Sequence, residues 1–129
     1  MVKIDGDCRR VLEATEWVTI ATAGPDGPHL AATWGDYIRN LGVDWESGVV
    51  TIPVGGMERT EANLALDPRV EVLWASRQVD GTYGPGQGCL LRGRGEFETS
   101  GARADAARAS YPWARAVLIV HAEEVRTLL

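Results

Sequence analysis

The segment Gly55-Gly56-Met57-Glu58-Arg59-Thr60 combines residue types that bind anions. Two adjacent glycines let backbone amides approach an oxyanion closely, and a helix beginning after them would direct its positive partial charge to the same point. Arg59 offers a planar fork for two phosphate oxygens, and Thr60 adds a hydroxyl. The segment matches neither a P-loop nor a GxGxxG turn, so an ordinary Gly-Gly turn before a helix N-cap is the alternative.

A second group of residues could surround a flat ring. Five of the nine aromatic residues are tryptophan, and Thr33-Trp34-x-x-Tyr37 and Trp113 lie near glycine-containing segments. Flat rings beside glycine-rich backbone suit a planar cofactor. Trp34 and Tyr37 have opposite parity along a strand, so they share a side only if a bulge at Gly35 intervenes. The alternative places one ring in the core and the other at the surface.

Other chemistries have little support in the sequence. Cys8, Cys89, His29 and His121 are not spaced like zinc ligands, so no metal site is predicted. The two cysteines are expected to be buried or idle thiols, because they form no disulfide framework. No GxSxG elbow, HExxH motif or Cys-His arrangement is present, so no catalytic residue is predicted.

Composition and charge narrow the class of protein. The chain has 129 residues, which fits one domain spanning 1–129, and it is 45% hydrophobic and 24% charged. A formal net charge of −5 disfavours nucleic acids and anionic membranes as partners. No apolar run approaches the roughly 20 residues of a membrane span, and the first ten residues lack the apolar stretch of a secretory signal. A soluble, cytoplasmic protein is expected.

Hydrophobic periodicity and turn residues predict a mainly β chain with hairpin connections. Strands are expected at 17–23, 29 to about 38, 49–54, 69–76, 89–99 and 115 to about 125. Short helices are expected at 7–14, 61–66 and 102–110, with Thr60 as the N-cap of the second. Gly24-Pro25-Asp26-Gly27 reads as a tight hairpin turn, and residues 78–88 as a glycine-rich excursion. Strands connected this way usually close into a small barrel, because closure removes exposed edges.

Several segments together resemble one family. They are Asp26-Gly27-Pro28-His29-Leu30, Thr33-Trp34, Pro53-Val54-Gly55-Gly56-Met57, Thr60-Glu61-Ala62-Asn63, Ser76-Arg77, Gly84-Pro85-Gly86, Arg92-Gly93 and Trp113-Ala114-Arg115-Ala116. In order and spacing they are similar to the FMN-binding split barrels related to pyridoxamine-phosphate oxidase, including the small flavin-binding proteins of sulfate-reducing bacteria. The resemblance covers about residues 11 to 129. It implies a six-stranded antiparallel split β-barrel with two or three short helices.

The resemblance also implies a ligand and its contacts. The cofactor would be FMN, bound non-covalently by a homodimer. The phosphate would be held by Gly55, Gly56, Arg59 and Thr60 with help from Thr33, directly after Pro53 and Val54. The flavin ring would be surrounded by Trp34, Tyr37 and Trp113, and Leu129 of one subunit would cover the flavin of the other.

The chain departs from the family pattern at four places. Arg59 stands where the pattern has lysine, and Ala32 replaces an asparagine before Thr33. Thr15 stands where the family has an acid near the flavin, and the loop at 40–48 is about two residues longer. These changes bear on the redox potential more than on binding.

Three functions remain open on the sequence. The leading hypothesis is a small FMN redox or electron-transfer module, which would also need a redox partner protein. The second is an FMN-dependent oxidoreductase, a flavin reductase or oxidase acting on a small substrate. The third is a barrel that binds another cofactor, such as haem or a deazaflavin.

Overall fold

The computed structural model describes residues 2–129. Its strands are β1 Trp17–Gly24, β2 Gly27–Trp34, β3 Val43–Asp44, β4 Val49–Val54, β5 Arg69–Gly81, β6 Gly84–Glu98 and β7 Ala116–Thr127. Its helices are α1 Gly6–Ala14, α2 Gly35–Leu41, α3 Glu58–Leu66 and α4 Ala102–Ser110. Every paired strand runs antiparallel to its neighbour, in one sheet of order β2-β1-β5-β6-β7-β4-β3.

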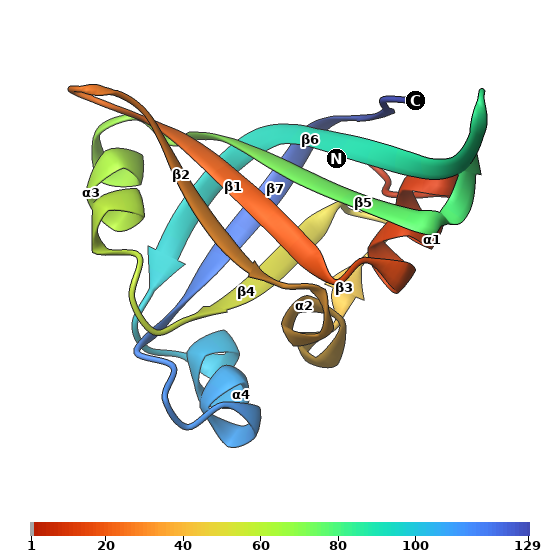
Figure 1. The fold of residues 1–129 in the computed structure, drawn as a ribbon. Helices are drawn as coiled ribbons and strands as arrows, with labels where there is room; N and C mark the ends of the chain where they lie inside the picture. The colour runs from red at the N-terminus through yellow and green to blue at the C-terminus, as the bar shows by residue number, and fades with distance from the viewer. Residues whose placement is uncertain (1) are drawn as a thin grey trace.

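The sheet curls strongly without closing, because β2 and β3 remain its two edges (Figure 1). The expectation of a mainly β, antiparallel architecture is confirmed. The expected six strands and two or three helices are wrong in number, since residues 2–129 form seven strands and four helices. The added elements, β3 and α2, both come from the stretch between Gly35 and Asp44.

The strand expected from 29 to about 38 ends early. β2 stops at Trp34, and the Gly35 amide then donates to the Glu16 carbonyl at 2.8 Å. A Cβ on Gly35 would collide with the Thr15 carbonyl, so only glycine lets the chain turn this closely past the end of α1. The chain continues as α2, which buries Ile38 in the core. Burial of this helical face outweighs the strand propensity of the local sequence.

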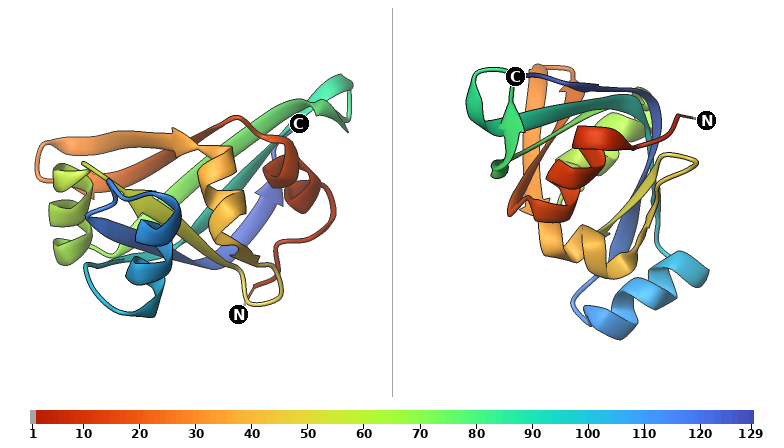
Figure 2. Two further views of the ribbon diagram at one scale, coloured as in Figure 1. Left: turned by 90° about the horizontal axis from the view of Figure 1, so that it is seen from below. Right: turned by 90° about the vertical axis from the view of Figure 1, so that its right-hand side faces the viewer.

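The glycine-rich stretch at 78–88 is a long hairpin arm and not a loop. β5 runs to Gly81 and β6 starts at Gly84, with a register shift between Ser76 and Asp80. Positive φ angles at Gly84 and Gly86 allow the tight return of the chain. The arm extends beyond the rest of the sheet on the side where the chain ends (Figures 1 and 2).

The core lies inside the curled sheet, beneath α1. Its largest enclosed side chains include Trp74, Leu12, Ile20, Ile52 and Leu118. The indole Nε1 of Trp74 donates to the Cys8 carbonyl at 3.0 Å, so the buried ring satisfies its polar atom while it packs. None of the helices within residues 2–129 has the length and apolar run that a bilayer crossing requires.

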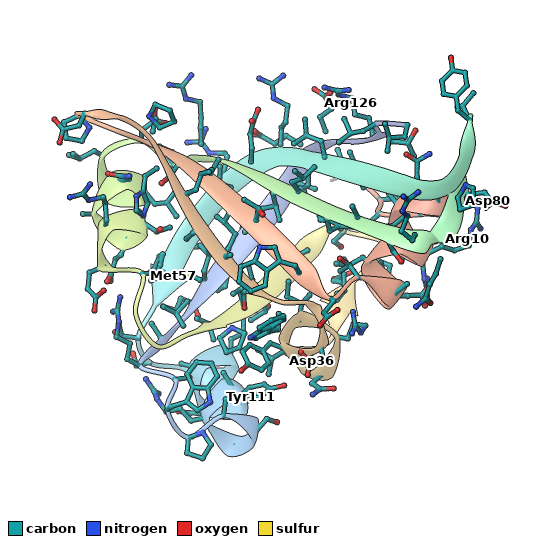
Figure 3. All side chains as sticks on the ribbon, in the orientation of Figure 1. Arg10, Asp36, Met57, Asp80, Tyr111 and Arg126 are labelled. Carbon is teal, nitrogen blue, oxygen red and sulfur yellow. A yellow bond between two sulfur atoms is a disulfide. The ribbon has the colours of Figure 1, made fainter. Side chains whose placement is uncertain are left out.

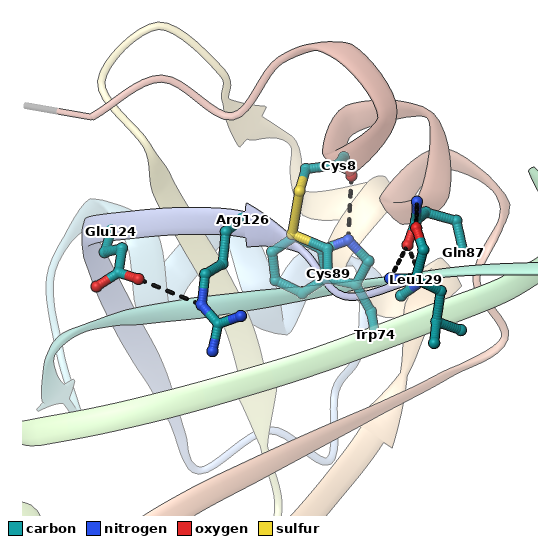
Figure 4. Close-up of a disulfide and its surroundings, with 8 residues drawn as sticks. Cys8, Trp74, Gln87, Cys89, Glu124, Arg126 and Leu129 are labelled. Carbon is teal, nitrogen blue, oxygen red and sulfur yellow. Dashed lines mark hydrogen bonds and ion pairs between the residues drawn. A yellow bond between two sulfur atoms is a disulfide. The ribbon is translucent and has the colours of Figure 1, made fainter. Parts of the chain in front are cut away.

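A disulfide joins Cys8 of α1 to Cys89 of β6 (Figure 4). The expectation of separate thiols is therefore wrong. The Cα atoms are 5.4 Å apart, although the residues are separated by 81 positions in sequence. Sequence spacing could not show this pairing, because packing of α1 across the sheet brings the two residues together. Both cysteines are buried, so the bond fastens α1 to the core from inside.

Reduction of this disulfide should lower the free energy of unfolding by about 4 kcal/mol, because the bond closes a long loop in the unfolded chain. Urea unfolding with and without reductant measures the difference. The Cys8→Ala/Cys89→Ala double variant is the control, since reductant should leave its midpoint unchanged. Two reactive thiols in protein unfolded without reductant would contradict the prediction.

Candidate functional site

The N-terminus of α3 has an unusual backbone. Met57, its N-cap, has φ 60° and ψ 33°, and it is the one non-glycine residue with positive φ among residues 2–129. Such a conformation costs free energy for a side chain of this size, and it occurs in tight turns and at functional sites. The Glu61 amide makes the first intrahelical bond, to the Met57 carbonyl at 2.9 Å. The amides before it point out of the helix end, where they can bind an anion.

Thr60 lies in the first turn of α3 and is not the N-cap that the sequence suggested, because the helix begins earlier than expected, at Glu58. Its side chain is fully enclosed, and its hydroxyl is the one buried side-chain polar atom without a hydrogen-bond partner in the described part of the chain. Such a group costs free energy unless a ligand satisfies it. The donors at this helix end therefore fit a phosphate group.

Arg59 lies on a different side of α3. It is exposed and lines a cavity of about 500 Å³ between α3 and the β1–β2 hairpin, where Asp26 of the turn and His29 of β2 also line it. Gly55, Gly56 and Thr60 do not line this cavity. The structure thus places Arg59 at a cavity that the other predicted phosphate contacts do not line.

The segment that carries Trp113 runs along the segment that carries the two glycines. The Arg115 amide donates to the Val54 carbonyl at 2.8 Å, which extends the pairing of β4 with β7 by one bond. A Cβ placed on Gly55 would lie 3.1 Å from Cε3 of Trp113, so the indole packs on bare backbone. The predicted aromatic residue and the predicted phosphate loop are therefore in contact.

Sequence reasoning missed the role of Arg115 in joining these segments. Its Nε and Nη2 atoms donate to the Gly56 carbonyl at 3.1 and 2.6 Å, and its Nη1 lies 2.9 Å from Oε1 of Glu61. One side chain thus connects the start of β7 to both the glycine turn and α3. The Trp-Ala-Arg-Ala motif contained this residue, but its spacing alone did not show which backbone it would reach.

Three aromatic rings gather where α2 meets the turn before β7. Tyr37 and Trp113 have ring centroids 5.4 Å apart, and Tyr111 lies 4.7 Å from Tyr37 and 5.5 Å from Trp113. The expectation of a strand with a bulge at Gly35 is wrong, because Tyr37 belongs to the first turn of α2. Met57 and Tyr111 lie at the same end of the molecule, far from Arg10 and Asp80 (Figure 3).

Trp34 has a different neighbour. Its ring meets Trp17 edge-on at 4.7 Å between centroids, because the β1–β2 register pairs these residues. Trp34 and Tyr37 nevertheless line one cavity of about 490 Å³, together with Thr15, Glu16, Asp36 and Arg39. This volume lies in the range of small-molecule sites. The exposed carboxylates of Glu16 and Asp36 were not among the predicted site residues.

Thr15, which stands where the family pattern has an acid, makes hydrogen bonds that join neighbouring elements. Its hydroxyl shares its one proton between the carbonyls of Trp17 and Ala75, at 3.0 and 2.9 Å, and its own carbonyl accepts from Nη1 of Arg39 at 2.7 Å. A neutral residue with a guanidinium beside it makes the potential at this cavity less negative than an acid would. Ala32 is half-buried on β2 opposite Thr19 and offers no polar side chain.

The remaining predicted residues differ in accessibility. Thr33, Pro53 and Val54 are buried within the single chain. Leu129 lies at the other end of the molecule from α3 and α4 (Figures 1 and 4). Its carbonyl accepts from Nε2 of Gln87 at 2.5 Å, and its amide donates to Oε1 of Gln87 at 2.7 Å. Within one chain, Leu129 is not part of the site.

Comparison with known proteins gives one close relative and several similar folds. An FMN-binding protein of Nitratidesulfovibrio vulgaris is 44% identical over 117 residues, which cover 91% of this chain and 92% of the relative. HupZ of Group A Streptococcus has a TM-score of 0.76 at 19% identity and covers 99% of this chain and 94% of its own. A heme binding protein of Mycobacterium smegmatis has a TM-score of 0.64 at 20% identity, covering 93% of this chain and 51% of that protein.

The two solved structures show a shared fold, whereas the sequence matches show the family. The Pyridoxamine 5'-phosphate oxidase family model matches residues 4–129, which include the glycine turn, both predicted tryptophans and Arg59. The resemblance stated from the motifs is confirmed: the chain belongs to the pyridoxamine 5'-phosphate oxidase family.

Proposed function

We propose that this protein is a non-covalent FMN-binding flavoprotein, with one FMN-binding domain per chain, that serves as a small electron-transfer module. The observation that carries the proposal is the contact between Trp113 and Gly55, since it joins an aromatic surface to a helix end with unsatisfied donors. A flavin mononucleotide needs an aromatic surface for its ring and hydrogen-bond donors for its phosphate, and the two must lie no farther apart than the ring and the phosphate of one FMN molecule. The relative in Nitratidesulfovibrio vulgaris, named for FMN binding, supports the same cofactor.

Bound FMN would supply reversible one- or two-electron redox chemistry, while the protein supplies orientation and electrostatics. The amides at the start of α3, with the Thr60 hydroxyl and Arg59, would hold the phosphate. Trp113 and Tyr37 would lie against the ring on one side, and Trp34 would line the neighbouring cavity. Thr33 and Val54 would support these groups from the core side.

Each of the two alternative functions has one observation in its support. Glu16 and Asp36 at the aromatic cavity would suit a reductase or oxidase that moves a proton near the flavin. The fold shared with a heme binding protein of Mycobacterium smegmatis is compatible with a haem ligand. The absorption spectrum of apoprotein titrated with FMN, haem or a deazaflavin separates the ligands, and NAD(P)H oxidation by the loaded protein separates a carrier from a reductase.

Trp34→Ala and Trp113→Ala should each weaken FMN binding about 2- to 10-fold and brighten bound FMN, because close electron-rich rings quench flavin fluorescence and stabilise the stack. Fluorescence titration measures both effects. Trp45→Ala is the control, since this ring packs under Arg9 of α1 and neither lines the cavity of Trp34 nor pairs with Trp113. Equal affinity and equal quenching in all three variants would show that the aromatic slot is wrongly placed.

Arg59→Ala should weaken FMN about 10- to 100-fold, which corresponds to a charge-assisted contact of roughly 1.5–3 kcal/mol. Riboflavin has no phosphate, so its affinity should stay nearly unchanged. Arg59→Lys should recover most of the loss, because it keeps the charge. Parallel titrations of both ligands measure the difference. Equal losses for FMN and riboflavin would mean that Arg59 supports the fold or the ring instead.

We further propose that the protein is a homodimer. The outward face of β2, β1 and β5 carries an apolar strip of exposed side chains, since the register places Trp17 beside Trp34 and Leu73 next to Thr19. Leu30, 66% exposed, continues the strip beside Ala21. Extended apolar surface of this kind usually contacts a partner, and twofold dimers are the commonest homo-oligomers. A second copy would also bring Leu129 to a flavin that it cannot reach within its own chain.

Light scattering should therefore give about twice the chain mass of 14.0 kDa. Leu30→Glu should produce a folded monomer, because the new charge would be buried at the interface. Leu66→Glu, on the exposed side of α3 and outside the strip, is the matched control and should leave the dimer intact. A wild-type protein that binds FMN as a monomer would contradict this.

A cytoplasmic location is also part of the proposal. The Cys8–Cys89 disulfide argues against this location, because such bonds persist mainly in oxidising compartments. Both cysteines are buried, however, and burial shields the bond from cytoplasmic reductants. Alkylation of free thiols at the moment of cell lysis measures which form the cell contains.

A further inference from the structure

We infer that Arg115 is a positioning residue for the phosphate of the bound nucleotide. It pairs with the Gly56 carbonyl and the Glu61 carboxylate, so that these two hydrogen-bond acceptors do not oppose the phosphate, and it does not contact the phosphate itself. The inference rests on the proposed function. It concerns the groups that would oppose an anion at the start of α3, namely the carbonyl of Gly56 and the carboxylate of Glu61 in the first turn.

The guanidinium of Arg115 contacts both of these acceptors. Two of its nitrogens donate to the Gly56 carbonyl, at 3.1 and 2.6 Å, and the third lies 2.9 Å from Oε1 of Glu61. Bonds from two nitrogens occupy the Gly56 carbonyl oxygen, so this acceptor is paired with Arg115 and is less available to oppose an anion. The fork geometry of arginine permits both contacts at once, which a lysine ammonium cannot reproduce.

The ion pair has a second effect, on the local charge. A carboxylate in the first turn of a helix already benefits from the helix dipole, and it would compete with and repel a phosphate there. Arg115 neutralises Glu61 in a half-buried position, where solvent screens charge less than at the surface. Glu58, the other acid of this turn, is exposed, and its Oε2 lies 3.7 Å from the position of a Cβ on Gly56, so its charge is screened by solvent and not by Arg115.

The backbone of Arg115 is held independently of its side chain. Nη2 of Arg108 donates to the Arg115 carbonyl at 2.9 Å, and Nε of Arg108 donates to the Ala114 carbonyl at 3.0 Å. The Arg115 amide donates a hydrogen bond to the Val54 carbonyl. Loss of the Arg115 side chain should therefore leave Trp113 in place, so an effect on the phosphate can be separated from an effect on the ring.

The test compares FMN with riboflavin on apoprotein. Arg115→Met should weaken FMN about 10-fold or more and change riboflavin less than 3-fold, because riboflavin has no phosphate. Adding Glu61→Gln should recover at least half of the FMN loss on a logarithmic scale, since the repulsive carboxylate is gone. Arg115→Lys should lie between wild type and Arg115→Met. Arg10→Met makes the same charge change at the opposite end of the molecule and should leave FMN affinity unchanged (Figure 3).

Each other outcome overturns the inference in a distinct way. Equal losses of FMN and riboflavin would make Arg115 a support for the fold or ring. A loss that Glu61→Gln does not recover would make it a direct phosphate ligand. Unchanged FMN binding in Arg115→Met would leave it without a role. Failure of the wild-type protein to bind FMN would instead refute the proposed function.

Discussion

The antiparallel pairing of β4 with β7 is the constraint on which the rest of the site depends. It places Val54 opposite Ala116, and the additional bond from the Arg115 amide carries the alignment past the end of β4. The glycine turn and the Trp-Ala-Arg segment leave the sheet side by side for this reason. Trp113 can then pack on Gly55, and the Arg115 side chain can reach the Gly56 carbonyl. A shift of one residue in this register would turn both side chains to the other face and separate the two halves of the site.

Helix α3, which follows the glycine turn, begins with two unfavourable local features. Its N-cap, Met57, has a left-handed backbone, and the enclosed Thr60 hydroxyl lacks a partner. Absence of a side-chain cap is shared by all four helices, so it does not distinguish α3. The backbone conformation and the unsatisfied hydroxyl do distinguish it. A fold holds such features where surrounding contacts overdetermine them, and here these contacts are the β4–β7 pairing and the Arg115 fork.

The opposite end of the molecule is held by a disulfide and by side-chain hydrogen bonds to the backbone. The disulfide fastens α1 to β6, Trp74 bonds the backbone of Cys8, and Gln87 holds the last residue of the chain (Figure 4). α1 connects this end to the aromatic cavity, because the carbonyls of Leu12 and Thr15 at its C-terminal end accept from Arg39 of α2. The cavity that contains Trp34 and Tyr37 is thus supported by a helix that is covalently anchored in the core.

The sequence by itself determined the features that depend on neighbouring residues. Gly24-Pro25-Asp26-Gly27 predicted the β1–β2 turn, and the motifs identified the family. The same turn fixes the pairing of Trp17 with Trp34, because a two-residue hairpin sets the register of its strands. Only the tertiary structure decided that the chain after Trp34 becomes a helix, since burial of Ile38 overrides strand propensity there. It also decided that Cys8 bonds Cys89, that Trp113 lies on Gly55, and that Arg115 holds Gly56 and Glu61. These contacts join positions from 54 to 81 residues apart, and their energies arise from packing and pairing across the sheet, which no local pattern of residues contains.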